Sequence, residues 1–104
     1  MFDPIKKLLG FGAKADIGEL IRKGALIIDV RTPAEYASGH IRKSVNIPLD
    51  TLKGRVSKLK KDVPVITCCA SGMRSSAARS ILQANGFAEV YNGGSWHSLR
   101  KYEK

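Results

Sequence analysis

Short apolar runs along the chain alternate with segments that have the spacing of amphipathic helices. The runs are candidates for β-strands, because a strand buried on both faces carries apolar side chains without interruption. They lie at residues 25–28, 44–47, 63–68 and 89–91. The third run is rich in β-branched side chains, and Pro64 stands near its start, where a strand tolerates proline. We therefore expect four strands from the pattern alone.

Five segments between and around these runs have helical spacing and suitable ends. They cover residues 16–23, 32–39, 50–59, 75–85 and 95–102. Four of them begin with a good N-cap side chain, namely Asp16, Thr32, Asp50 or Thr51, and Ser95. Gly24 and Gly86 are expected to end the first and fourth helices, and turns are expected at residues 60–62 and 92–94.

The alternation of strands and helices with short links predicts an α/β domain with a mainly parallel sheet. A length of 104 residues suits one domain, and 43% hydrophobic with 26% charged residues is a globular composition. We place an N-terminal extension at residues 1–12 and the folded domain at residues 13–104.

The net charge of +9 is spread over the chain and changes this picture little. Only Lys58, Lys60 and Lys61 cluster, and no aromatic residues alternate with them as a nucleic-acid platform needs. We expect a solvated basic surface that attracts small anions, with no nucleic-acid partner.

No run approaches the roughly 18 apolar residues of a membrane helix, and residues 1–12 lack the apolar block of a signal peptide. We expect no membrane contact and a cytoplasmic location.

The two cysteines, Cys68 and Cys69, are adjacent and therefore make poor disulfide partners for each other. The only histidines, His40 and His97, lie far from them in sequence, so we expect no metal site and no cofactor. Cys68 continues the strand pattern and is expected to be a buried thiol. Cys69 starts the following turn, which makes it the candidate for a reactive thiol.

The segment from Cys69 to Arg74 follows a strand and precedes a helix, at the edge where parallel sheets bind ligands. The helix N-terminus offers free N–H groups and a positive dipole, and both favour the reactive thiolate. Ser71 and Gly72 are small enough for the loop to curl around an anion, and Arg74 adds a positive charge suited to an oxyanion. This arrangement predicts nucleophilic attack on an anionic, electrophilic centre.

Residues 69–75 resemble the active-site loop of rhodanese domains, which has Cys, two residues, Gly, one residue, Arg and often Ser. Other segments resemble further signatures of that family in the same order along the chain. They are the Asp-Val-Arg segment at 28–36, Gly-His-Ile at 39–41, Asn-Ile-Pro at 46–48, and the segments 86–87 and 90–96. The resemblance spans residues 25–96.

The resemblance implies a sheet of about five parallel strands with helices on both faces. It implies a sulfurtransferase in which Cys69 takes sulfane sulfur from thiosulfate or a persulfide and passes it to a thiol or cyanide. The residues that it places around the bound sulfur are Ala70, Ser71, Gly72, Met73, Arg74 and Ser75. Asp29 and Arg31 are implied as supporting residues. The partners implied are a small anionic donor, a thiol acceptor and, as a candidate, a protein persulfide.

Three structural expectations accompany the resemblance. Arg31 and Glu35 are four residues apart and are expected to pair on the helix surface. Trp96 is expected in the core, and His40 is expected to pack or hydrogen-bond rather than to act in the site.

The sequence departs from the family pattern at two places. Residues 42–44 are Arg-Lys-Ser where a Pro-Gly-Ala-like run is usual, which affects a turn. Ala70 and Met73 stand where many relatives have polar or basic residues, so Arg74 is the only charge in the loop. This departure argues against thiosulfate as the natural donor and in favour of a larger or more apolar one.

Two other functions stay open at this point. Counted from Cys68, the spacing to Arg74 resembles phosphatases and arsenate reductases with a longer loop, although Thr67 stands where those phosphatases have His. A non-catalytic binding module is the second alternative, because a fold does not fix a function. A further hypothesis gives Cys68 a role in releasing sulfur from Cys69 or in protecting it.

Overall fold

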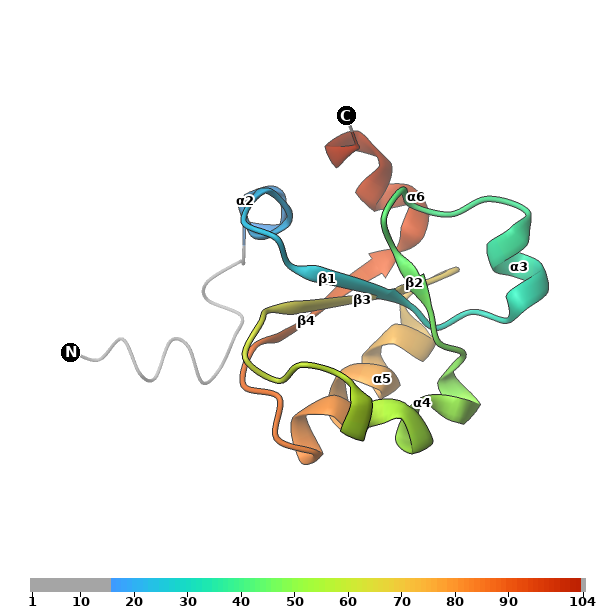
Figure 1. The fold of residues 1–104 in the computed structure, drawn as a ribbon. Coiled ribbons are helices and arrows are strands. Elements are labelled where there is room, and N and C mark those ends of the chain that lie inside the picture. Colours follow the sequence, from blue (N-terminus) through green and yellow to red (C-terminus); the bar gives the residue numbers. More distant parts are fainter. Residues whose placement is uncertain (1–15, 104) are drawn as a thin grey trace.

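The computed structural model describes residues 16–103 as alternating strands and short helices around one sheet (Figure 1). The elements in chain order are α2 (Ile17–Arg22), β1 (Leu26–Asp29), α3 (Pro33–Ala37), β2 (Val45–Asn46), α4 (Leu49–Arg55), the 3-10 turn η1 (Val56–Lys58), β3 (Val65–Cys69), α5 (Met73–Ala84), β4 (Val90–Ser95), α6 (Trp96–Leu99) and η2 (Arg100–Tyr102). The expected extension at residues 1–12 lies outside the described residues.

The sheet is fully parallel and has the strand order β2-β1-β3-β4. This confirms the α/β class and corrects the strand count that the family resemblance implied, four instead of about five. The four strands are the four apolar runs of the sequence, and no other segment of residues 16–103 pairs with either edge of the sheet.

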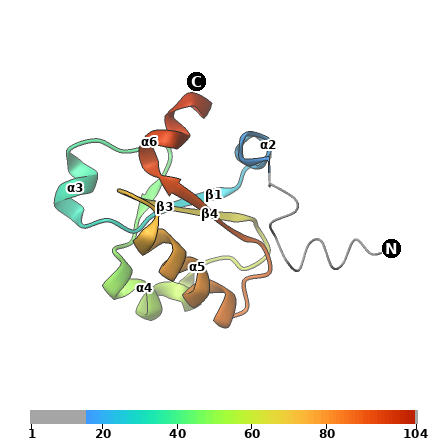
Figure 2. The ribbon, with the colours of Figure 1, turned by 180° about the vertical axis from the view of Figure 1, so that it is seen from behind.

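Helices cover both faces of the sheet, as Figures 1 and 2 show from opposite sides. One apolar cluster packs on the side of α4 and α5 and includes Ile28, Val65 and Leu82. A second cluster, with Ile27 and Ile66, packs against residues of α2, α6 and η2 on the opposite side. Successive strand residues alternate between the clusters, because side chains in a strand point to opposite faces in turn.

The helix starts follow the predicted caps, with one exception. Asp16 accepts a hydrogen bond from the Glu19 amide at 3.1 Å, and Thr32 forms a reciprocal capping box with Glu35. Helix α4 begins at Leu49, with no side-chain cap, rather than after Asp50 or Thr51 as predicted. Pro48 occupies the N-cap position in an extended conformation, with φ −54° and ψ 145°, so the helix starts directly after it.

The predicted turn at residues 92–94 is wrong, because these residues belong to β4. The glycines are required there by close packing rather than by chain reversal. A Cβ on Gly93 would lie 2.8 Å from Cγ2 of Ile66 and 2.9 Å from the Thr67 carbonyl oxygen. Glycine in this strand therefore marks a close approach of β4 to β3, which a turn pattern in sequence does not distinguish.

Candidate active site

The loop between β3 and α5 lies at the carboxyl end of the sheet, on the same side as α3 (Figures 1 and 2). Gly72 is the N-cap of α5 and has φ +105°, a conformation that favours glycine. A Cβ at this position would also lie 3.5 Å from the Cα of Gly94. The loop therefore turns tightly between β4 and the end of β3, and α5 starts at Met73, two residues earlier than predicted.

The Cys69 sulfur lies against the first turn of α5. Its Sγ accepts hydrogen bonds from the amides of Gly72 at 3.0 Å and Ser75 at 3.3 Å. In the thiol form Sγ also donates to Oγ of Ser75 at 3.5 Å, and in the thiolate form that hydroxyl can turn and donate instead. The sequence places helix N–H groups near this sulfur, and the two amides that the structure brings to it are those of Gly72 and Ser75.

These contacts set the ionisation of Cys69. Burial of the sulfur disfavours the thiolate, but the Ser75 hydroxyl and the amides of Ser75, Gly72 and Ser71 together outweigh burial. The pKa of Cys69 therefore lies below the ordinary value of a thiol. A thiolate at moderate pH is the form that attacks electrophiles.

Ser75 is held in place by residues that sequence reasoning did not assign to the site. Its hydroxyl donates to Oδ1 of Asn92 at 2.6 Å, and its carbonyl accepts from the Thr67 hydroxyl at 2.9 Å. Asn92 also donates to the Gly72 carbonyl at 3.3 Å and accepts from the Gly94 amide at 2.9 Å. A polar Thr67 inside an apolar run was the available sequence signal, and Asn92 was hidden in a segment that resembled a turn.

Arg74 forms an ion pair that the sequence did not predict. Its Nη1 and Nη2 donate to the two carboxylate oxygens of Glu35 at 2.8 and 3.1 Å, and each side chain is 37% exposed. The Arg74 contact, followed by the Thr32 amide of the capping box, lowers the pKa of Glu35 to about 2. Glu35 therefore joins helix α3 to the loop that carries Cys69.

The predicted pairing of Arg31 with the Glu35 carboxylate is wrong. Arg31 folds back onto the buried carboxylate of Asp29, with Nε 2.9 Å and Nη2 2.7 Å from its oxygens. Arg31 binds Asp29 because the Asp29 carboxylate is fully buried beside it. The Glu35 carboxylate already accepts hydrogen bonds from Thr32 and Arg74. Arg31 reaches only backbone carbonyls on that side, those of Glu35 and Gly39.

Asp29 and Arg31 make no contact with the sulfur of Cys69. Together they hold the segment that follows β1, and the Arg31 guanidinium lies 4.7 Å from the ring centroid of Trp96. Trp96 is half-buried and packs against the second apolar cluster. His40 is exposed and stacks on Tyr36 with a centroid separation of 3.8 Å, which is a packing role.

Cys68 occupies the opposite face of β3 from Cys69. It is fully buried in the second cluster, beside Ile27 and Leu99. Burial, with a smaller contribution from the Asp29 charge, raises the pKa of the Cys68 thiol to about 12. Cys68 is therefore a neutral core side chain, turned away from the amides that surround its neighbour.

The outer wall of the loop is formed by uncharged side chains. Ala70, Ser71 and Met73 are exposed, and Met73 is 80% exposed. Among residues 16–103, no group of three or more His, Cys, Asp or Glu side chains is arranged to hold a metal ion. In the same range no helix has the length and apolar character needed to cross a bilayer.

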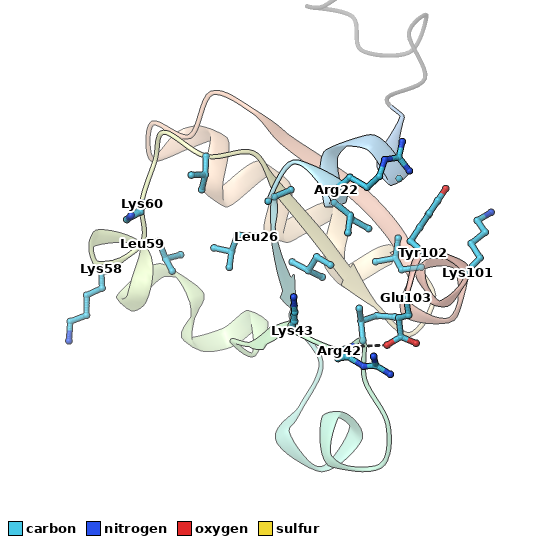
Figure 3. A pocket seen from close by; sticks show the side chains of 18 residues that line it. Arg22, Leu26, Arg42, Lys43, Lys58, Leu59, Lys60, Lys101, Tyr102 and Glu103 are labelled. Carbon is cyan, nitrogen blue, oxygen red and sulfur yellow. Dashed lines mark hydrogen bonds between the residues drawn. The ribbon is translucent and has the colours of Figure 1, made fainter.

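A groove with a volume of about 1090 Å³ lies elsewhere on the molecule (Figure 3). Its floor includes Leu26 and Leu59, and basic side chains such as Arg22, Lys58 and Lys101 stand around it. It shares no residue with the loop from 69 to 75 and lies near the start of β1. The groove is therefore separate from the candidate site.

Comparison with known proteins shows the family of this chain. A family model of the rhodanese-like domain matches residues 14–98. A sulfurtransferase of Allochromatium vinosum is 39% identical over 67 residues, which cover 64% of this chain and 63% of that protein. The thiosulfate sulfurtransferase GlpE of Ectopseudomonas mendocina is 35% identical over 74 residues, covering 71% of this chain and 68% of that protein.

Another relative, the protein YqhL of Bacillus subtilis, is 44% identical over 68 residues. That match covers 65% of this chain and 54% of YqhL, so the chain spans less than two thirds of YqhL and of the Allochromatium protein.

Solved structures show the same architecture. A rhodanese from E. coli with bound anions is 32% identical with a TM-score of 0.68, covering 72% of this chain and 91% of that one. The human single-domain sulfurtransferase TSTD1 shares the fold at 23% identity, with a TM-score of 0.75 and coverage of 86% and 93%. By its sequence signatures, its parallel sheet and the loop around Cys69, this chain belongs to the rhodanese-like domain family, which includes sulfurtransferases.

Proposed function

We propose that the protein is a sulfurtransferase that carries sulfane sulfur as a persulfide on Cys69. The observation that supports this most directly is the position of Sγ, within hydrogen-bond distance of the Gly72 and Ser75 amides at the N-terminus of α5. Those amides stabilise negative charge on the sulfur, both in the thiolate that attacks and in the persulfide that forms. The names of the relatives as sulfurtransferases agree with the proposal.

The reaction has two displacement steps at sulfur. In the first, the Cys69 thiolate attacks the outer sulfur of a donor, a Cys69 S–S bond forms, and the donor's S–S bond breaks. The leaving group carries away the electron pair, as sulfite from thiosulfate or as a thiolate from a persulfide. In the second, an acceptor thiolate or cyanide attacks the outer sulfur and restores the Cys69 thiolate.

The roles of the remaining loop residues follow from their positions. Ser71, Gly72 and Ser75 supply N–H groups around the sulfur, and Arg74 supplies a charge beside it. Ala70 and Met73 form an uncharged rim. The partners that we propose are a small sulfur donor and a thiol acceptor, with a protein persulfide as a candidate donor in a cytoplasmic setting.

The alternative nucleophile, Cys68, has the wrong surroundings for phosphatase or arsenate reductase chemistry. It contacts apolar core residues, and its pKa of about 12 keeps it protonated at neutral pH. The non-catalytic binding module is separated from the proposal by experiment, since it needs no reactive thiol.

The test is the intact mass of the reduced protein after incubation with thiosulfate or with cysteine persulfide. We expect a gain of about 32 Da, one sulfur atom, that dithiothreitol removes. The gain should be lost in Cys69→Ser and kept in the matched variant Cys68→Ser. Absence of the added mass with both donors would overturn the proposal, and so would its retention in Cys69→Ser.

A further inference from the structure

The ion pair between Arg74 and Glu35, beside the Cys69 loop, affects which sulfur donor the protein accepts. Arg74 is the only charged residue between positions 69 and 75. It lies in the first turn of α5, directly before Ser75, whose amide contacts the Cys69 sulfur, so its charge stands close to the reacting atom. Its guanidinium is held by both carboxylate oxygens of Glu35, at 2.8 and 3.1 Å.

Glu35 is held firmly in the position that neutralises Arg74. Oε1 of Glu35 also accepts from the Thr32 amide at 2.9 Å and from the Thr32 hydroxyl at 3.2 Å. The Glu35 amide in turn donates to the Thr32 hydroxyl at 3.2 Å. The carboxylate is therefore fixed by the start of α3, and it stays ionised over the whole neutral range.

The charges of Arg74 and Glu35 cancel, and the exposed rim of Ala70, Ser71 and Met73 adds no charge, so the Cys69 thiolate is the one charge of the loop that is left unbalanced. A donor that carries two negative charges is repelled by the Cys69 thiolate, and the neutralised Arg74 provides little attraction to offset that repulsion. A persulfide attached to an organic or protein thiol carries at most one charge at the reacting group, and its carbon substituent can contact the exposed Met73 side chain.

We propose that Glu35 is a positioning residue that sets donor selectivity, by neutralising Arg74 so that the site takes substituted persulfides in preference to thiosulfate. This inference rests on the proposed sulfurtransferase function and names its substrate class. The transfer balances for a neutral persulfide R–S–SH. The Cys69 thiolate forms a bond to the outer sulfur, the S–S bond of the donor breaks, and R–S⁻ leaves with the electron pair while Cys69 becomes the persulfide Cys69–S–SH.

The experiment compares second-order rates of Cys69 loading from thiosulfate and from cysteine persulfide, followed by intact mass. The amino and carboxyl charges of cysteine persulfide cancel, which leaves the sulfur group to set its charge. Wild type should load faster from cysteine persulfide. Glu35→Gln leaves the Arg74 charge unpaired, and the ratio of the thiosulfate rate to the persulfide rate should rise roughly tenfold at low salt. Added salt should reduce that gain.

Two further variants show whether Glu35 acts through Arg74. In the Arg74→Gln background, Glu35→Gln should no longer change the donor ratio, because no charge is left to expose. Glu19→Gln is the matched control, since Glu19 pairs with Arg22 in α2 and its loss changes the net charge by the same amount. The control should leave the ratio unchanged.

The outcomes separate this inference from the proposed function. If wild type gains no sulfur from either donor, the proposed function itself fails. If wild type loads but Glu35→Gln leaves the ratio unchanged, or Glu19→Gln changes it equally, the selectivity role of Glu35 is refuted while the sulfurtransferase stands. Each ratio is taken on one protein sample, so a partial loss of folded protein cancels.

Discussion

Cys68 and Cys69 are neighbours in β3, and the pleat of the strand sends their side chains to opposite faces of the sheet. Cys69 meets the amides of α5, which lower the pKa of its thiol despite burial. Cys68 meets an apolar cluster, which raises its pKa to about 12. One backbone step therefore separates a sulfur suited to nucleophilic attack from one suited to packing.

This contrast predicts the alkylation behaviour of the two thiols. At pH 7 iodoacetamide should add one group to the folded protein and two to the urea-unfolded protein, as counted by intact mass. The folded Cys69→Ser variant should take up none, because the Cys68 thiol stays protonated and packs in the second apolar cluster, away from the exposed loop. Folded Cys68→Ser should still take up one. Modification of Cys68 in the folded protein would contradict the assignment of the two environments.

At the scale of elements, short helices and strands are held by a few specific contacts. Helix α3 has only five residues, Pro33–Ala37, so it depends on the capping box between Thr32 and Glu35. Strand β4 depends on the absence of a side chain at Gly93, where Ile66 and the Thr67 carbonyl come close. Both elements contribute residues that contact the loop from 69 to 75, Glu35 from α3 and Asn92 from β4.

Removing the N-cap of α3 should destabilise the protein. Thr32→Ala loses the acceptor for the Glu35 amide, and we expect a loss of about 1 kcal/mol in the free energy of unfolding by urea. Thr51→Ala is the matched control, because its hydroxyl bonds to the Pro48 carbonyl and caps no amide. An equal loss of unfolding free energy in both variants would show that the capping box stabilises the protein no more than an ordinary threonine hydrogen bond.

Two glycines of the fold should respond to alanine in opposite directions. Gly54 lies in α4, and a Cβ added to it would have no other atom within 4 Å, so Gly54→Ala should stabilise by about 0.5–1 kcal/mol. Gly93→Ala in β4 places a methyl group against the Thr67 carbonyl of β3 and should destabilise by about 1–3 kcal/mol. Thermal unfolding measures both shifts. An unchanged unfolding temperature in Gly93→Ala would mean that β4 can move away from β3.

The sequence predicted these elements unevenly, for physical reasons. Apolar runs and caps are local signals, and they located all four strands and the start of α3. The extent of β4 was missed because Gly93 is explained by contacts with β3, which lie far away in sequence. The Arg74–Glu35 pair was missed for the same reason, since 39 positions separate its partners. The position of Cys69 against the N-terminus of α5 was predicted because the strand, the short loop and the helix follow one another in the chain.

At the scale of the whole molecule, the parallel sheet brings distant segments together at one end. The ends of β1, β3 and β4 place Asp29, Cys69 and Ser95 along the same edge, as the register of the strands shows. The Glu35–Arg74 pair then joins the first half of the domain to the second. The basic groove lies away from this edge and shares no lining residue with the loop from 69 to 75.

The link between the two halves should be sensitive to acid. The pKa of Glu35 is lowered to about 2 in the folded protein, from an ordinary value of 4.5. A lowered carboxyl pKa stabilises the fold fully above about pH 4.5, and this contribution is lost as the pH falls towards about 2. The stability advantage of wild type over Glu35→Gln in urea should therefore shrink between these values. An advantage that is constant with pH would show that the ion pair does not contribute to folding.

Cys69 has no exposed surface, although the loop above it is exposed. If the protein is the sulfurtransferase that we propose, a donor meets the sulfur only in conformations in which the loop has moved aside, and such openings exist at equilibrium in folded proteins. If the loop recloses faster than sulfur reacts, every observed rate is the intrinsic rate of the thiolate multiplied by the open fraction. A substitution that changes only loop opening then scales all donors by one common factor. Selectivity between donors and overall speed are thus separately adjustable properties of this site.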